Sequence, residues 1–100
     1  METQRLMLAE DVFDSLLTGK ICAIRKGRRD ILLGELIFES TESHRTQKVK
    51  VHTVIITELQ RVPFRYVLND GFIGYEDMLV KLKRFYPDIE LTSECTVIVF

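Results

Sequence analysis

The sequence predicts a small α+β barrel of about five or six short strands, with one helix near the N-terminus and a longer helix before the last strand. Three observations lead to this prediction. Short apolar segments of strand length recur along the chain, two segments space their apolar residues as helices do, and helices do not alternate regularly with strands. A parallel α/β sheet needs that alternation, so a compact barrel fits the pattern better.

The composition favours a single domain over residues 1–100. Of the 100 residues, 46% are hydrophobic, which suffices for one core without disulfide or metal staples. The chain carries 14 Lys and Arg against 15 Asp and Glu, so any nucleic acid must bind a local patch. No apolar stretch approaches the ~20 residues of a membrane helix, and residues 1–9 lack the features of a signal peptide. We therefore expect a cytoplasmic protein with no membrane partner.

The N-terminal segment predicts a strand, a helix and a second strand. Residues 5–9 alternate loosely, as in a short strand. Apolar residues then recur at helical spacing over residues 12–17, with acidic residues between them, and Gly19 is a typical residue to end a helix. Residues 20–25 are short, apolar and β-prone, as expected of the second strand.

The middle of the chain predicts a hairpin followed by a bent strand. After a polar turn at residues 26–30, residues 36–38 belong to a third strand. Residues 41–47 contain no apolar side chain and are expected to form an exposed hairpin loop. The next strand alternates from Lys48, but the apolar run at residues 54–56 breaks the alternation. We expect a bend or bulge there, since small barrels need bends to close.

The C-terminal segment predicts the longer helix and a buried strand. Apolar residues at helical spacing cover residues 75–86, with acidic side chains first and basic ones last, and Pro87 ends the pattern. Residues 95–100 are apolar on both faces, as expected of a strand in the middle of a sheet. A tag or truncation at this end is therefore expected to damage the core.

Residues 17–25, Leu-Thr-Gly-Lys-Ile-Cys-Ala-Ile-Arg, resemble the motif G-x-K-x-x-T-x-R of the ASCH family, a relative of the PUA fold. The interval from Lys20 to Arg25 matches, whereas the glycine falls one place late and Ala23 stands where the family usually has threonine. Similar segments follow in the family's order at residues 33–38, 70–72, 86–87 and 96–100. The resemblance covers nearly the whole chain and implies a single PUA-like ASCH barrel of the small bacterial branch.

What the resemblance implies for function is a cleft containing a lysine, a threonine and an acidic residue. The best described activity of the small bacterial branch is hydrolysis of N4-acetylcytidine to cytidine and acetate. Lys20 takes the lysine position, Asp70 is the expected acid and Glu76 is the reserve. The sequence neither supports nor excludes a protein-binding adaptor, and two functions lead, both without a cofactor: a module that binds RNA or a modified nucleoside, and an amidohydrolase. Ala23 counts against the second, because alanine supplies no nucleophile.

The candidate binding residues form a basic cluster and one aromatic. Five of the 14 basic residues fall within ten positions, where they either contact phosphates or form a solvated turn; they are Lys20, Arg25, Lys26, Arg28 and Arg29. Phe72 either stacks on a flat base or packs in the core. Asp70 either accepts a hydrogen bond from an exocyclic amine or caps the following helix.

The cysteines and histidines predict no metal site. Cys22 and Cys95 lie far apart, with no second cysteine at ligand spacing, and are expected to be reduced and buried. His44 falls in the polar loop and His52 on an exposed strand face, so both are expected at the surface.

Overall fold

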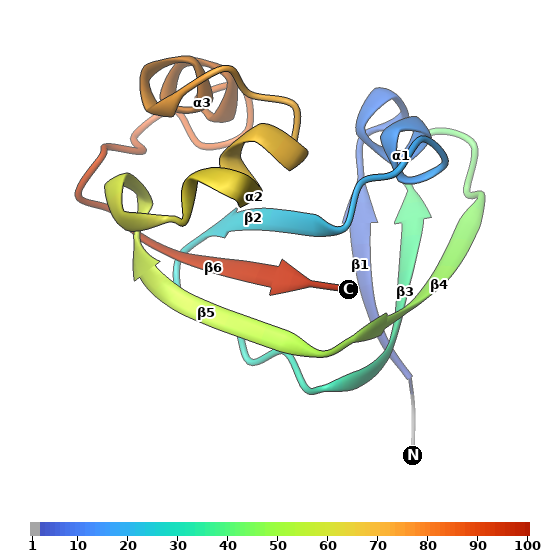
Figure 1. Cartoon of the computed structure of the whole chain (residues 1–100). Helices are drawn as coiled ribbons and strands as arrows, with labels where there is room; N and C mark the ends of the chain where they lie inside the picture. Colours follow the sequence, from blue (N-terminus) through green and yellow to red (C-terminus); the bar gives the residue numbers. More distant parts are fainter. Residues whose placement is uncertain (1–2) are drawn as a thin grey trace.

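The computed structural model describes residues 3–100 and shows an α+β fold (Figure 1). Within that range, six strands form two three-stranded sheets, accompanied by three α-helices and one 3₁₀ turn. The elements are β1 (Gln4–Leu8), α1 (Glu10–Leu16), β2 (Cys22–Lys26), β3 (Gly34–Ser40), β4 (Thr46–Val51), β5 (Thr53–Glu58), η1 (Leu59–Arg61), α2 (Phe64–Asn69), α3 (Tyr75–Leu82) and β6 (Glu94–Val99). The predicted α+β class is confirmed. Over residues 3–100 the strands pair as two separate sheets, and no closed barrel is found.

The first sheet has the order β1-β3-β4. β1 runs parallel to β3, and β3 pairs antiparallel with β4. Leu36 and Phe38 of β3 point into a core that also contains Phe13 of α1. The helical spacing of apolar residues in α1 places Phe13 on the face that packs against this sheet.

The second sheet is antiparallel and has the order β2-β6-β5. Its central strand β6 is buried from Cys95 to Val99, as the apolar C-terminal segment predicts. Val97 belongs to one core cluster and its neighbour Ile98 to the other. β6 thus separates two cores, which explains why both of its faces are apolar.

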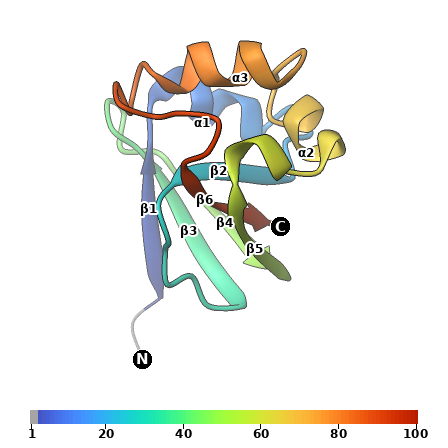
Figure 2. The ribbon, with the colours of Figure 1, turned by 90° about the vertical axis from the view of Figure 1, so that its left-hand side faces the viewer.

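Helices α2 and α3 cover the outer face of the second sheet. Met78 and Leu82 of α3 and Val67 of α2 pack with Val97 of β6 in the second core. The helices gather at one end of the molecule, and the chain enters from the opposite end (Figures 1 and 2). None of the helices in the described part of the chain has the length and apolar character required to cross a bilayer.

The bend between β4 and β5 lies at His52 and not at residues 54–56 as the alternation predicts. β4 belongs to the first sheet and β5 to the second, so the chain changes sheets at this polar residue. Val54 packs against the first core and Ile55 against the second. The apolar run therefore reflects a strand covered on both faces, and not a bulge.

Two helix predictions also need correction. α3 ends at Leu82, and residues 83–86 continue only as hydrogen-bonded turns, in which Tyr86 N donates to Leu82 O at 2.9 Å. Proline disfavours the α conformation only for the residue before it, here Tyr86, so Pro87 limits the turns after α3 but does not set the end of the helix at Leu82. α2 is not predicted at all, because its six residues are too few to show a helical stripe. The polar loop is shorter than predicted, since β4 already begins at Thr46.

Candidate functional site

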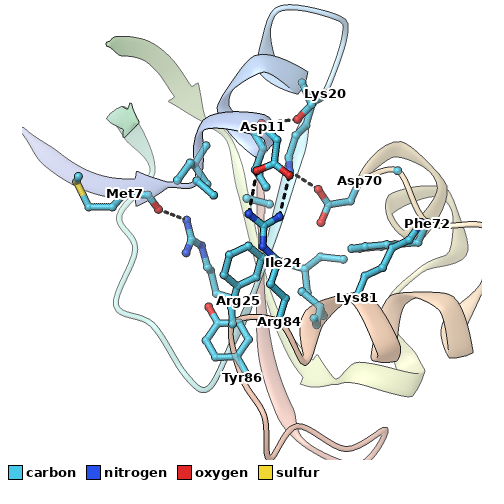
Figure 3. Close-up of a pocket in the computed structure, with 18 of the residues that line it drawn as sticks. Met7, Asp11, Lys20, Ile24, Arg25, Asp70, Phe72, Lys81, Arg84 and Tyr86 are labelled. Atoms are coloured by element: carbon cyan, nitrogen blue, oxygen red, sulfur yellow. Dashed lines mark hydrogen bonds and ion pairs between the residues drawn. The ribbon is translucent and has the colours of Figure 1, made fainter. Parts of the chain in front are cut away.

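A cleft of about 780 Å³ lies where α1, β2 and the segment that follows α3 meet (Figure 3). The end of β1 and the turn after α2 complete its wall. Most of the surface is apolar, but six charged side chains from distant parts of the sequence also line it: Asp11, Lys20, Arg25, Asp70, Lys81 and Arg84. A cavity of this size, with a few convergent polar groups, is typical of a small-molecule site.

Lys20 and Asp70 form an ion pair in the wall of this cleft. Each side chain is only 6% exposed. Lys20 Nζ contacts Asp70 Oδ1, and no other group of residues 3–100 donates a hydrogen bond to that oxygen. The charges are thus neutralised while a lone-pair site on Asp70 is left available.

Asn69 holds Lys20 next to Asp70. Its Oδ1 accepts a hydrogen bond from Ile21 N at 2.8 Å, and its Nδ2 donates to Gly19 O at 3.3 Å. The amide therefore binds the backbone on both sides of Lys20 from the residue that precedes Asp70. Gly19 has a φ of 104°, which favours glycine and lets the chain turn from α1 into this position.

The buried position of Asp70 changes its acidity. Burial raises the pKa of the Asp70 carboxyl, and the positive charges of Lys20 and Arg25 only partly oppose this effect. The carboxyl consequently keeps a proton at higher pH than an exposed aspartate does. A carboxyl with a raised pKa in a cleft holds a proton more readily than an ordinary aspartate, as a general acid or base requires.

Arg25 and Ala23 project from β2 into the same cleft. Arg25 Nη2 donates to Met7 O at 2.7 Å, and no carboxylate of residues 3–100 lies within ion-pair distance of its guanidinium. Ala23 belongs to the first core and offers only a methyl group. Cys22, on the other face of the strand, belongs to the second core.

The thiol of Cys22 is fully buried and packs in the core, as expected. Its Sγ donates to Tyr66 O at 3.4 Å. Burial and the nearby charge of Asp70 raise the pKa of this thiol to about 12, against the opposing charge of Lys20. Cys95 is likewise a buried free cysteine. Cys22 therefore does not replace the oxygen that Ala23 lacks.

A second ion pair connects α1 to the segment after α3 across the cleft (Figure 3). Arg84 Nη1 donates to Asp11 Oδ2 at 2.7 Å, and Nη2 donates to Oδ1 at 3.2 Å. The hydrogen bonds and charge of Arg84 lower the pKa of Asp11. Both side chains are more than half exposed. We call this pair the Asp11–Arg84 clasp.

The basic cluster predicted from the sequence divides into two groups. Lys20 and Arg25 line the cleft, whereas Lys26, Arg28 and Arg29 do not. Arg28 Nε lies 3.6 Å from a carboxylate oxygen of Glu94, and Arg29 Nε donates to Lys26 O at 3.2 Å. These three residues belong to the end of β2 and its turn, so closeness in sequence does not make them part of the cleft.

The remaining candidates lie as follows. Phe72 is half-buried against the second core, which confirms packing, and it also lines the cleft, where stacking on a base stays a prediction. Glu76 is exposed in the first turn of α3 and does not line the cleft. Asp70 does not cap α3, because the cap is Gly74 and the carboxylate of Asp77 accepts the hydrogen bond from Ile73 N. The capping interpretation of Asp70 is therefore wrong.

Sequence reasoning missed Asn69, Asp11 and Arg84 as contributors to the site. Each looks like an ordinary polar residue in or beside a helix, and no local pattern indicates its partner. The hydroxyl groups of Ser15 and Thr41 were also missed, although both line the cleft. Tyr86, which also lines the cleft, carries a third hydroxyl.

No group of three or more His, Cys, Asp or Glu within residues 3–100 is arranged to hold a metal ion. Both histidines are exposed, as expected. His44 Nδ1 lies 3.2 Å from a carboxylate oxygen of Glu39, and neither histidine lines the cleft. Among the ionisable side chains that line the cleft, Lys20 and Asp70 form the buried ion pair.

Comparison with known proteins finds no match: no family model, no curated protein and no solved structure is similar enough to this chain to be matched with it. The ASCH resemblance stays a prediction that rests on the segments named above. The geometry of the cleft is thus the basis for any functional assignment.

Proposed function

We propose that the chain is an ASCH-type, PUA-like domain that binds a modified nucleoside, either free or within RNA, in the cleft lined by Lys20 and Arg25. One observation carries the proposal, namely that Lys20 and Asp70 form a buried ion pair in the wall of that cleft. Burying two charges costs stability that their attraction seldom repays. An ion pair placed in a cleft is therefore better explained by ligand recognition than by folding.

The groups around the pair suit a nucleobase. Asp70 accepts a hydrogen bond from an exocyclic amine, and Lys20 donates to a base carbonyl. Phe72, at the turn after α2, offers a flat face for stacking. Apolar walls from β1 and α1 exclude water from these polar contacts, which strengthens them.

Three features support the ASCH assignment. Lys20 and Arg25, the matching residues of the motif-like segment, line one cleft. A short helix precedes that segment, and the last strand occupies the centre of its sheet. In this proposal the two sheets correspond to the two sides of a PUA-like barrel.

Isothermal titration with cytidine and N4-acetylcytidine tests the binding function. We expect at least one nucleoside to bind the wild-type protein, and binding to be lost in the Lys20→Met, Asp70→Leu double variant, which removes both charges at similar volume. The Lys26→Gln, Arg28→Gln variant is the matched control, because both residues lie outside the cleft, and it should bind normally. Absence of nucleoside binding by the folded wild-type protein contradicts the proposal.

A second candidate function is amidohydrolase activity on N4-acetylcytidine. The raised pKa of Asp70 beside the positive charge of Lys20 favours it. Asp70 takes a proton from water, the resulting hydroxide attacks the acetyl carbon, and Lys20 stabilises the oxyanion. The C–N bond then breaks, and the proton passes from Asp70 to the leaving amine, so one water is consumed and cytidine and acetate are released. Water serves as the nucleophile because Ala23 has no oxygen.

Chromatography of N4-acetylcytidine after incubation with the protein separates the two functions. Formation of cytidine that disappears in Asp70→Asn, while the variant stays folded, identifies an enzyme. Binding of N4-acetylcytidine without turnover identifies a binding module. Turnover that survives in Asp70→Asn excludes the proposed role of this carboxyl.

A further inference from the structure

The cleft is lined by more positively than negatively charged side chains. Four are cationic and two are anionic: Lys20, Arg25, Lys81 and Arg84 against Asp11 and Asp70. Each of the two carboxylates already pairs with one cation, Asp70 with Lys20 and Asp11 with Arg84. Lys81 Nζ lies 3.2 Å from Asp77 Oδ2, outside the cleft lining. Arg25 has no carboxylate of residues 3–100 within ion-pair distance, and its charge acts on Asp70 only from farther away.

Arg25 therefore provides an uncompensated positive charge in a partly apolar cleft. The only side-chain hydrogen bond of Arg25 within residues 3–100 runs from Nη2 to Met7 O, and a guanidinium has five N–H donors. Low-dielectric walls concentrate the field of such a charge. The planar fork of arginine matches the oxygens of a phosphate better than it matches a single carbonyl.

The Asp11–Arg84 clasp can supply a second cation to the same place. Figure 3 shows Arg25 and Arg84 reaching into the cleft in the same general direction, toward β1 and α1. The clasp is 55% exposed at Arg84 and 65% exposed at Asp11, and ion pairs exposed to this extent contribute little stability in water. A phosphate can therefore displace Asp11 at small cost and receive Arg84 as well as Arg25.

We infer that the ligand is a nucleoside monophosphate, with its base at the Lys20–Asp70 pair and its phosphate between Arg25 and Arg84. The inference rests on the proposed nucleoside-binding function and names the class of ligand. A single phosphate fits better than an RNA strand, because the chain has a net charge of −1 and the other basic cluster lies outside the cleft. A strand requires a continuous track of cations.

Calorimetric titration of the wild-type protein with cytidine, cytidine monophosphate and inorganic phosphate tests the inference. We expect the nucleotide to bind at least about tenfold more tightly than cytidine, the effect of one or two charge-assisted hydrogen bonds. The preference should shrink in high salt. Arg25→Gln and Arg84→Gln should each reduce the preference for the nucleotide, and Asp11→Asn, which frees Arg84 from its carboxylate partner, should increase it. Arg28→Gln is the matched control and should leave the preference intact.

Each alternative outcome identifies a different failure. Equal affinity for cytidine and its monophosphate overturns the phosphate subsite and leaves nucleoside binding intact. If neither cytidine nor its monophosphate binds, both the phosphate subsite and the nucleoside-binding function are overturned. A preference for nucleotide that persists in both Arg25→Gln and Arg84→Gln, or inorganic phosphate that binds as tightly as the nucleotide, also overturns the inference. Tighter binding of an RNA oligonucleotide that depends on Arg28 and Arg29 shows that RNA is the ligand. Because Arg84 is exposed, Arg84→Gln remains informative even where Arg25→Gln fails to fold.

Discussion

Lys20, at the approach to β2, and Asp70, at the end of α2, form an ion pair that is nearly inaccessible to solvent. The pair connects the helical layer to the second sheet in the wall of the cleft. Burying both charges removes solvation that their attraction seldom repays, so the pair contributes little to the stability of the fold. Its energetics can be measured separately from any ligand.

Removing one partner of this pair is expected to be costly. Lys20→Met should lower the free energy of unfolding by about 3–5 kcal/mol at pH 7, because it leaves the carboxylate of Asp70 buried without a counter-charge. The double variant Lys20→Met, Asp70→Leu should be close to wild type. Urea unfolding of the three proteins measures both differences. A single variant as stable as the double variant would show that the pair is solvated.

The cost of Lys20→Met should also depend on pH. Burial raises the pKa of Asp70, so this carboxyl is protonated at higher pH than in the unfolded chain. The destabilisation should therefore shrink as pH falls, because a neutral carboxyl needs no counter-charge. Repeating the urea unfolding at pH 4 and pH 7 checks the sign. If Lys20→Met destabilises the protein as much or more at pH 4 than at pH 7, the raised pKa of Asp70 is contradicted.

Asn69 is expected to act as a positioning residue for Lys20. Asn69→Ala removes the hydrogen bonds to Gly19 and Ile21 and should cost about 1–2 kcal/mol, near 1 kcal/mol for each bond. It should also weaken nucleoside binding, although Asn69 does not line the cleft. Gln60→Ala is the control, because the Gln60 side chain is exposed and its amide donates only to the carboxylate of Glu58. Normal ligand affinity in Asn69→Ala argues against the positioning role.

Cys22 is expected to resist thiol reagents in the native protein. Burial raises the pKa of its thiol from 9.0 to about 12, so this group stabilises the fold fully below pH 9 and loses that contribution as pH rises toward 12. An aromatic disulfide reagent at pH 8 should label neither cysteine until urea is added. Thr92→Cys places a thiol at an exposed position and should react at once. Rapid labelling of the native wild-type protein contradicts the buried position.

Glu10 should make the polar loop sensitive to acid. Hydrogen bonds from Ser40 and Ser43, together with one from Arg45, lower the pKa of Glu10 to about 2. A carboxyl with a depressed pKa stabilises the fold above its unfolded value of 4.5 and loses this effect as pH falls toward 2. The stability difference between wild type and Glu10→Gln should therefore disappear over this interval. A pH-independent difference shows that charge is not involved.

The C-terminal strand contributes to the first core through an aromatic pair. The ring centroids of Phe38 and Phe100 lie 5.2 Å apart. Phe38→Ala should cost about 3–5 kcal/mol because Phe38 is fully buried. Phe100→Ala should cost less, since Phe100 is only partly buried. Ile73→Ala, at a residue 83% exposed, should change thermal stability very little. Equal effects at Phe100 and Ile73 would exclude a packing role for the last residue.

Local patterns in the sequence predict several elements correctly. The spacing of apolar residues around Phe13 predicts α1, and the two-sided apolar character of residues 95–100 predicts the central strand β6. Both features depend on periodicity, which a chain displays without its partners. α2 escapes detection because six residues are too short for a helical stripe, and the bend at His52 is hidden because β5 is covered on both faces.

For the candidate site, the sequence predicts fewer of the residues, and the tertiary structure decides which of them meet. The sequence alone predicts Lys20 and Arg25 as a pair on or beside one strand, and Asp70 only through a resemblance. The tertiary structure decides that Asp70 meets Lys20, that Asn69 brackets that lysine, and that Asp11 and Arg84 close over the same cleft. It also separates Arg28 and Arg29 from the cleft. Local periodicity determines where strands and helices form, whereas the packing of α2 and α3 on the second sheet determines which charges meet, because that packing joins residues distant in sequence.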